Sequence, residues 1–126
     1  MVGLVVVSHG EMAAKGIAEV AGEMAGDTRI EPVGGDGSGG FGTVADDIQA
    51  AIADADSGDG VVVLVDLGSA VMNAEVAIEM SEADAVIADA PILEGAVNAA
   101  VAATSPKATV ESVVEQAEAA GDIDKL

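Results

Sequence analysis

Apolar residues follow two alternating patterns along the chain. Unbroken apolar runs, typical of strands buried on both faces of a parallel sheet, alternate with segments of helical spacing. The predicted strands cover Val2–Val7, Arg29–Val33, Val61–Val65 and Ala85–Ala88. The predicted helices cover Glu11–Met24, a segment after Thr43 through Ile52, a segment from Ser69 through Met80, Leu93–Ala103, and a segment from Ser105 to Gly121.

This succession of strands and helices predicts an α/β fold with a doubly wound, open, mainly parallel sheet. Right-handed crossovers with a reversal after the second strand give the strand order 2-1-3-4. Pro32 suits an edge position for the second strand. Residues 1–126 form one expected domain, long enough to bury roughly two-thirds of its unfolded surface.

Local signals predict where the helices begin and which residues they bury. Thr43 with Asp46, then Ser69, and then Ser105 followed by Pro106 are the expected helix starts. The expected apolar stripes are Ala13, Gly16, Ile17, Val20 and Met24 in the first helix, Val44, Ile48, Ala51 and Ile52 in the second, Val97 and Val101 in the fourth, and Val110, Val113, Val114 and Ala117 in the last.

Composition narrows the possible partners. The chain has 23 acidic residues against four basic ones, and a net charge of −19 disfavours binding to nucleic acid or to an anionic membrane. It has no cysteine, and no apolar run approaches the roughly 20 residues of a membrane helix. With strand one following Met1 directly, we expect no signal peptide and a cytoplasmic domain.

The carboxylates are spread along the whole chain, mainly where the helical patterns face water. Large apolar side chains and lysines are few. This distribution is typical of adaptation to concentrated salt, which screens repulsion over about 3 Å at 1 M. It predicts a halophilic source and a fold that needs salt, and the alternative is an ordinary acidic protein.

His9 is the only histidine, and it lies between the end of the first strand and the start of a helix. The carboxyl edge of an open α/β sheet is where ligands bind, and a helix N-terminus suits an anion. The strand order places Asp66 beside His9, where a carboxylate accepting from Nδ1–H would leave Nε2 free as nucleophile or ligand. The alternatives are a buried structural histidine and an Asp66 that only caps its helix.

Other residues near this edge add to the picture. The segment Gly34–Gly42 has six glycines in nine residues, which permit close backbone approach to a ligand but match neither a Walker loop nor a dinucleotide fingerprint. Asn73 is a candidate hydrogen-bonding group at the rim or an ordinary surface residue. The carboxylate of Glu11 adds a negative charge close to the anion expected at His9, and Lys15 could offset it.

Two other chemistries find little support. Ser8 and His9 are expected on opposite faces of the strand end, which disfavours serine hydrolysis. No Asp-x-Asp-x-Asp spacing indicates a metal site.

Four segments together resemble a known family. They are Val5-Val6-Val7-Ser8-His9, then Gly34-Gly35-Asp36 with Gly39 to Thr43, then Asp66-Leu67-Gly68-Ser69-Ala70-Val71-Met72-Asn73-Ala74-Glu75, and Ala90-Pro91-Ile92-Leu93-Glu94-Gly95-Ala96. The chain resembles the phosphotransfer subunit of phosphoenolpyruvate-dependent dihydroxyacetone kinase. The first domain of that subunit has the mannose-type IIA fold of the sugar phosphotransferase system.

The resemblance implies a phosphoenolpyruvate–glycerone phosphotransferase subunit in which His9 accepts the phosphoryl group and Asp66 orients His9. The donor would be a separate histidine phosphocarrier protein, and the acceptor would be ADP on the nucleotide-binding kinase subunit. A homodimer is implied, and transfer between histidines calls for no metal and no tightly bound cofactor. The expected phosphate- or partner-binding residues are Ser8, Gly10, Gly35, Gly42, Thr43, Gly68, Ser69 and Asn73.

Three alternatives stay open. The first is a mannose-type sugar-uptake IIA component, against which the Met72-Asn73 signature argues. The second is a small tetrapyrrole metal chelatase, whose first strand also ends in His-Gly, although those enzymes employ more metal-binding side chains. The third is a regulatory binding module that never carries phosphate.

Overall fold

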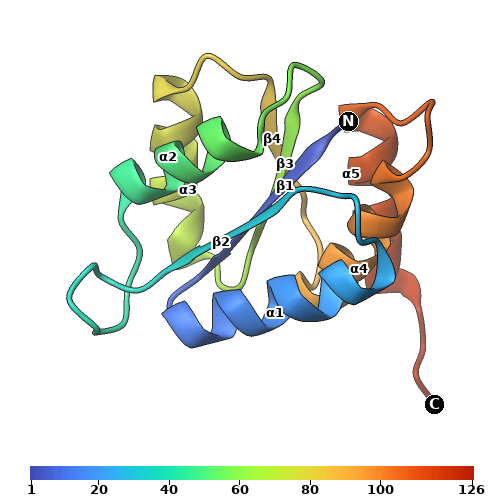
Figure 1. Ribbon diagram of the computed structural model, residues 1–126. Helices are drawn as coiled ribbons and strands as arrows, with labels where there is room; N and C mark the ends of the chain where they lie inside the picture. Colours follow the sequence, from blue (N-terminus) through green and yellow to red (C-terminus); the bar gives the residue numbers. More distant parts are fainter.

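A computed structural model describes residues 1–126, and its four strands form one parallel sheet in the order β2-β1-β3-β4 (Figure 1). This confirms the predicted α/β fold and strand order. No helix has the length and apolarity needed to cross a membrane. The elements are β1 (Gly3–Ser8), α1 (Glu11–Met24), β2 (Ile30–Gly34), α2 (Ala45–Ala55), β3 (Val61–Val65), α3 (Ser69–Met80), β4 (Ala85–Ile87), α4 (Ile92–Ala103), α5 (Val110–Ala119) and a final 3₁₀ turn (Ala120–Asp122).

Helices cover both faces of the sheet, α1, α4 and α5 on one side and α2 and α3 on the other. Because strand side chains alternate, Leu4 and Val6 of β1 point into the first core and Val5 and Val7 into the second. All four are fully buried. The unbroken apolar runs are therefore explained by burial on two faces.

The sheet order brings the segments of interest to one edge. Val7 of β1 is paired with Val65 of β3, and the N–H of Asp66 donates to the carbonyl of Val7 at 3.1 Å. On the other side, β1 ends against Gly34, where an added Cβ would lie 2.5 Å from the carbonyl oxygen of Ser8. Only glycine lets β2 approach the turn that carries His9 this closely.

The start of α5 differs from the predicted one. Ser105 and Pro106 lie in the turn after α4, and the helix begins at Val110. Thr109 is the N-cap, and its side chain and that of Ser112 form a reciprocal capping box. The capping box satisfies the backbone N–H groups of Thr109 and Ser112, whereas Pro106 would supply only a fixed φ. The capping box therefore stabilises the helix start more than the proline would.

The predicted caps of α2 and α3 are also wrong. The N-caps are Val44 and Gly68, and neither makes a side-chain capping bond. Asp46 lies in the first turn of α2, and Ser69 is the first residue of α3. The hydroxyls of Thr43 and Ser69 have tertiary partners instead, as described below.

In α1 and α4 the buried residues differ from those of the predicted apolar stripes. In α1 the buried residues are Ala14 and Ala21, with Ile17 packed against the core, and in α4 four of the five buried residues are alanines. Alanine lets a helix axis approach the sheet closely, so larger apolar side chains fall at the boundary. The exposed members of the predicted stripes are Ala13, Gly16, Val20, Met24 and Val101.

We expect this fold to lose stability in dilute buffer. Of the four basic side chains, Lys15, Arg29 and Lys125 are ion-paired, so most of the 23 carboxylates have no cationic partner. Their mutual repulsion favours the expanded chain unless salt screens it. Circular dichroism melts from millimolar to multimolar potassium chloride should show a rising melting temperature. An unchanged melting temperature across this range would contradict the prediction.

Candidate functional site

His9 and Asp66 contact each other at the carboxyl edge of the sheet, as the strand order predicts. The ring nitrogen Nδ1 of His9 lies 2.9 Å from Oδ1 of Asp66. The other carboxylate oxygen accepts from the backbone N–H of His9 at 3.0 Å and from the hydroxyl of Ser8 at 2.8 Å. Three donors thus hold this carboxylate in one orientation, and it in turn fixes the imidazole.

Two opposing effects act on the pKa of Asp66. Partial burial raises the pKa, but the hydrogen bonds from the backbone and ring of His9 and from Ser8 together outweigh burial and leave it below its usual value. The carboxylate therefore stays ionised at neutral pH. An ionised acceptor at Nδ1 selects the tautomer that carries its proton there, and it stabilises a positive charge on the ring.

Ser69 faces the opposite nitrogen. Its hydroxyl oxygen lies 2.8 Å from Nε2 of His9. Since Nδ1 donates to Asp66, Nε2 bears the lone pair and accepts from the hydroxyl. Ser69 therefore marks Nε2 as the reactive nitrogen. The sequence predicted this residue both as a helix cap and as a phosphate- or partner-binding residue.

Ser8 does not point away from His9, contrary to the expectation from strand alternation. The strand ends at Ser8, and both side chains turn toward Asp66. The Ser8 hydroxyl also accepts from the N–H of Gly10 at 3.1 Å. Ser8 and Gly10 are thus parts of the support of His9, and the Gly10 amide, an expected phosphate donor, is already engaged.

Two helix N-termini meet at His9. Helix α1 begins at Glu11 immediately after the His9 turn, and α3 begins at Ser69 after its N-cap Gly68. The first N–H groups of a helix lack intrahelical partners and carry the positive end of its dipole. At α3 the N–H groups of Ala70 and Val71 already donate to the carbonyls of Leu67 and Gly68, so this helix contributes chiefly its dipole. The first turn of α1 can in addition donate N–H groups to an anion held beside His9.

The glycine-rich segment is an ordered loop. Oδ1 of Asp36 accepts from the N–H and the hydroxyl of Ser38, at 2.9 and 2.8 Å, and from the N–H of Gly40 at 2.9 Å. These bonds hold the pKa of the exposed Asp36 carboxyl below its usual value. Gly35, with a φ of +82°, is buried against the first turn of α1.

Two further contacts tie this loop to the site. The N–H of Gly42 donates to the carbonyl oxygen of His9 at 2.9 Å. The side-chain amide of Asn73 donates to the hydroxyl and the carbonyl of Thr43, at 2.7 and 3.1 Å. Asn73 lies four residues after Ser69, on the same face of α3. It is a half-buried brace of the loop, which rules out an ordinary exposed polar residue.

The charge of Glu11 next to His9 has a partner. Its carboxylate accepts from Lys15 at 2.7 Å one helical turn away, as the sequence suggested. The hydrogen bond and charge of Lys15 lower the pKa of Glu11, so this exposed carboxylate stays ionised. The positive charge of Lys15 offsets the carboxylate beside the anion-binding helix end.

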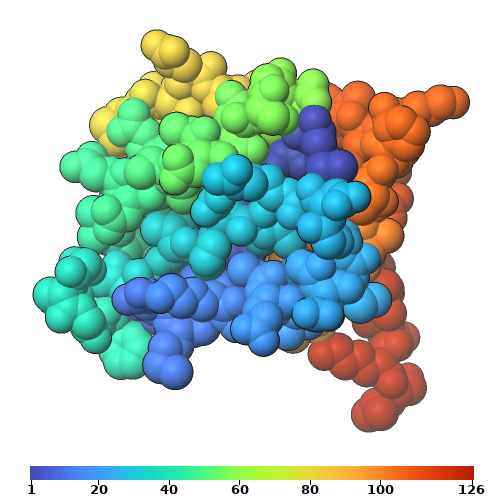
Figure 2. Space-filling model, in the orientation of Figure 1, coloured from blue at the N-terminus to red at the C-terminus, as the bar shows by residue number.

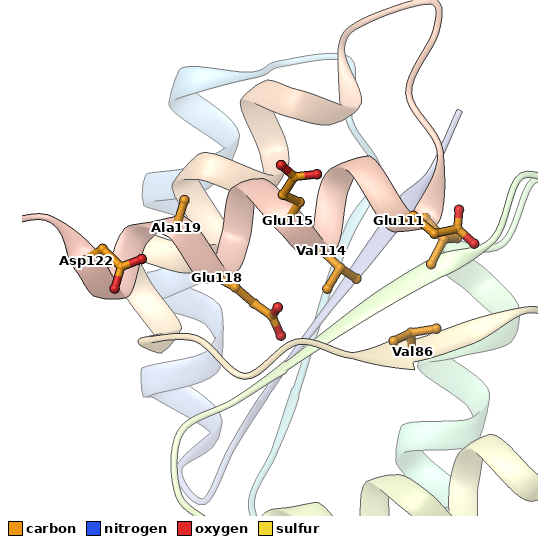
Figure 3. A pocket seen from close by; sticks show the side chains of 8 residues that line it. Val86, Glu111, Val114, Glu115, Glu118, Ala119 and Asp122 are labelled. Carbon is orange, nitrogen blue, oxygen red and sulfur yellow. The ribbon is translucent and has the colours of Figure 1, made fainter.

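Other cavities lie outside this cluster. A pocket of about 480 Å³ opens between β4 and α5, where Val86 and Val114 line it together with carboxylate side chains of α5 such as Glu118 (Figure 3). None of the predicted site residues lines it. A pocket of about 380 Å³ adjoins Asp66 between the ends of β3 and β4. Nowhere in residues 1–126 do three or more His, Cys, Asp or Glu side chains gather as metal ligands.

The parallel sheet with this strand order is the architecture of mannose-type IIA domains. Residues 3–114 match the EIIA-man family, described as "PTS system fructose IIA component". The chain belongs to this family. It is 98% covered by a solved phosphotransferase system component EIIA from Streptococcus agalactiae, at 18% identity and a TM-score of 0.69, a likeness that concerns the fold.

The names of the curated relatives are more specific than the family description. The chain is 42% identical over 94 residues, 75% of each chain, to the phosphoryl donor subunit DhaM of PEP-dependent dihydroxyacetone kinase 1 from Listeria innocua. It is 34% identical to the phosphotransferase subunit DhaM of the PTS-dependent dihydroxyacetone kinase from Lactococcus lactis, covering 92% of this chain and 93% of that one. A solved structure titled as a protein of unknown function, EF1359, has a TM-score of 0.85 at 30% identity over 99% of this chain and 98% of the other.

Sequence reasoning missed two residues that shape the site. Gly34 permits the close approach of β2 to the His9 turn, and Asp36 organises the loop after it. The signal for Asp36 was present, because an Asp two residues before Ser or Gly favours this kind of turn. The signal for Gly34 was hidden among five neighbouring glycines.

Proposed function

We propose that this chain is the phosphohistidine carrier of a phosphoenolpyruvate-dependent dihydroxyacetone kinase. It accepts a phosphoryl group from a histidine phosphocarrier protein and passes it to ADP on the nucleotide-binding kinase subunit. The carrier role rests on the named relatives. The proposal also includes a cytoplasmic setting, a homodimer and one carrier domain in residues 1–126. The observation that supports it best is the contact of Nδ1 with Asp66, which leaves Nε2 of the single histidine nucleophilic.

Each side chain has a defined part in the proposed transfer. The Ser69 hydroxyl leaves Nε2, and the Nε2 lone pair attacks phosphorus in line as the bond from phosphorus to the donor nitrogen breaks. The donor ring leaves with that electron pair. Nδ1 keeps its proton, so the phosphorylated ring is positive and is balanced by Asp66. The N–H groups in the first turn of α1 donate hydrogen bonds to the phosphoryl oxygens, and the dipole of α3 adds to their stabilisation.

The onward step uses the same geometry in reverse. A terminal phosphate oxygen of ADP attacks phosphorus, the P–Nε2 bond breaks, and Nε2 recovers its lone pair. Phosphohistidine is a high-energy link, so transfer to ADP needs no other energy source. The second subunit then carries the ATP that phosphorylates dihydroxyacetone.

The decisive experiment follows the phosphate. Phosphorylated protein is mixed with the nucleotide-binding subunit carrying radiolabelled ADP, and separately with a mannose-type permease subunit. We expect label to appear as ATP in the first mixture only. Transfer to the permease subunit alone would overturn the proposal and establish the sugar-uptake alternative, to which the family description also applies. None of the relatives described above is a chelatase.

A further inference from the structure

Large apolar side chains are unusually exposed around His9. Met12 is 88% exposed, Phe41 86%, Met72 75% and Leu67 58%. Apart from the C-terminal Leu126, the first three are the most exposed large apolar residues of the chain. We refer to these four side chains as the apolar ring. Exposed apolar area costs roughly 25 cal/mol per Å², so its concentration at one place calls for a reason.

Each member of the ring is close in the chain to an atom that contacts His9. Phe41 precedes Gly42, which donates to the His9 carbonyl, and Leu67 follows Asp66. Met72 lies one helical turn after Ser69, and Met12 lies in the first turn of α1. The four side chains therefore lie on the segments that form the site of the half-buried imidazole.

Phe41 is the only aromatic residue and is held in a prepared position. Its ring lies 3.5 Å from where a Cβ of Gly10 would stand, so it packs beside the His9 turn. The loop that carries it is fixed by Asp36 on one side and by Asn73 on the other. Residues 35–43 stand out from the surface next to the start of α1 (Figure 2). A rigid exposed aromatic side chain is typical of an interface anchor.

Few charged residues lie on the same surface. The segments His9–Ala13, Gly34–Thr43 and Asp66–Asn73 contain three carboxylates in a chain with 23. Each has partners: Glu11 contacts Lys15, Asp36 accepts from its own loop, and Asp66 contacts His9. A partner therefore meets few charges on this surface. An apolar contact surface on the partner would complement the ring.

We propose that the apolar ring, anchored by Phe41, is the docking surface for the ADP-carrying acceptor protein; this rests on the proposed function. Phosphorus must come within about 3 Å of Nε2 for transfer, so the protein that holds ADP has to cover the ring. The pocket beside Asp66 includes Leu67 but not Met12, Phe41 or Met72, so no small ligand in it would bury them. A protein surface around the nucleotide phosphate would bury these side chains.

The test separates docking from chemistry with a small phosphoryl donor. Phosphoramidate transfers its phosphoryl group to Nε2 with release of ammonia, and it needs no protein contact. We expect Phe41→Ala to be loaded by phosphoramidate at the wild-type rate. Its transfer to the ADP-carrying subunit should then show a KM raised about 10-fold or more, as for an interface anchor, with kcat little changed. Phe41→Leu should restore part of the loss.

Ile123→Ala is the matched control, because Ile123 is 64% exposed and lies near the C-terminus on another part of the chain. It should transfer as the wild type does. Phe41→Ala with an unchanged KM for the acceptor overturns the docking proposal while the proposed function stands. The docking proposal is also overturned if Phe41→Ala slows only the transfer from the donor protein. It is overturned too if the variant changes its oligomeric state in sedimentation and the loss of transfer follows from that change. Failure of the wild type itself to phosphorylate ADP overturns the proposed function, and the assigned occupant of the ring with it.

Discussion

Replacing His9 by Ala is expected to abolish phosphorylation and to leave the fold intact. The chain has no other histidine, and the ring makes hydrogen bonds only to the carboxylate of Asp66 and the hydroxyl of Ser69. In the variant, Asp66 keeps its bonds from the Ser8 hydroxyl and the backbone N–H of residue 9, so no buried charge loses all its partners. Incubation with phosphoenolpyruvate and the general phosphotransfer proteins, followed by intact mass measurement, checks the result.

Ser69→Ala is the matched control for this experiment. The Ser69 hydroxyl is the nucleophile nearest to Nε2, and a phosphoserine would survive acid whereas phosphohistidine would not. Ser69→Ala should still gain one acid-labile phosphoryl group, though more slowly. An acid-labile gain in His9→Ala would refute the assignment of His9, and an acid-stable one would move the acceptor role to Ser69. Circular dichroism of both variants verifies the fold.

The sequence predicts the elements and their order well because the strand signal is strong. Val61–Val65 is short, rich in β-branched residues and preceded by a glycine turn, which together predict a buried strand, and the short crossovers leave few topologies. The contact of His9 with Asp66 follows from the strand order alone, since β1 and β3 are neighbours. Long-range geometry could be predicted here because it depends on topology.

Local details failed where tertiary contacts replaced local ones. Thr43 and Ser69 have the residue types of helix caps, yet their hydroxyls contact Asn73 and His9. In α1, the many small residues leave the hydrophobic period ambiguous, and Ala14 rather than Val20 is buried. The side chain of Ser8 could not be oriented by alternation, because the strand ends at that residue. In each case the deciding partner lies far away in sequence.

Asp66→Asn is expected to slow phosphoryl transfer by about 10²- to 10⁴-fold, the range seen when a carboxylate that orients a catalytic histidine becomes an amide. Asp66 now accepts from three donors with two oxygens. An asparagine has one oxygen, which the Ser8 hydroxyl and the backbone N–H of His9 can share. Its NH₂ group then faces Nδ1 and donates to it.

This reversal moves the ring proton to Nε2, where Ser69 would have to accept it. The nitrogen that should attack phosphorus then lacks a lone pair, so the rate falls even though the fold persists. Asp56→Asn is the matched control: Asp56 accepts from Gly58 in a turn after α2, at the opposite edge of the sheet. It removes the same charge and should leave the transfer rate unchanged. Single-turnover loading of the wild type and both variants measures the effect.

The pH dependence of stability gives a second readout. The pKa of Asp66 is lowered in the folded protein, so its contribution to stability is fully present above its unfolded value of about 3.9 and is lost as pH falls through the folded one. The melting temperature of Asp66→Asn should therefore lie below that of the wild type at neutral pH, and the gap should narrow below about pH 4. A variant that melts earlier but transfers phosphate at the wild-type rate would show that Asp66 supports the fold only. Slow transfer with the expected narrowing of the gap assigns Asp66 to the orientation of His9.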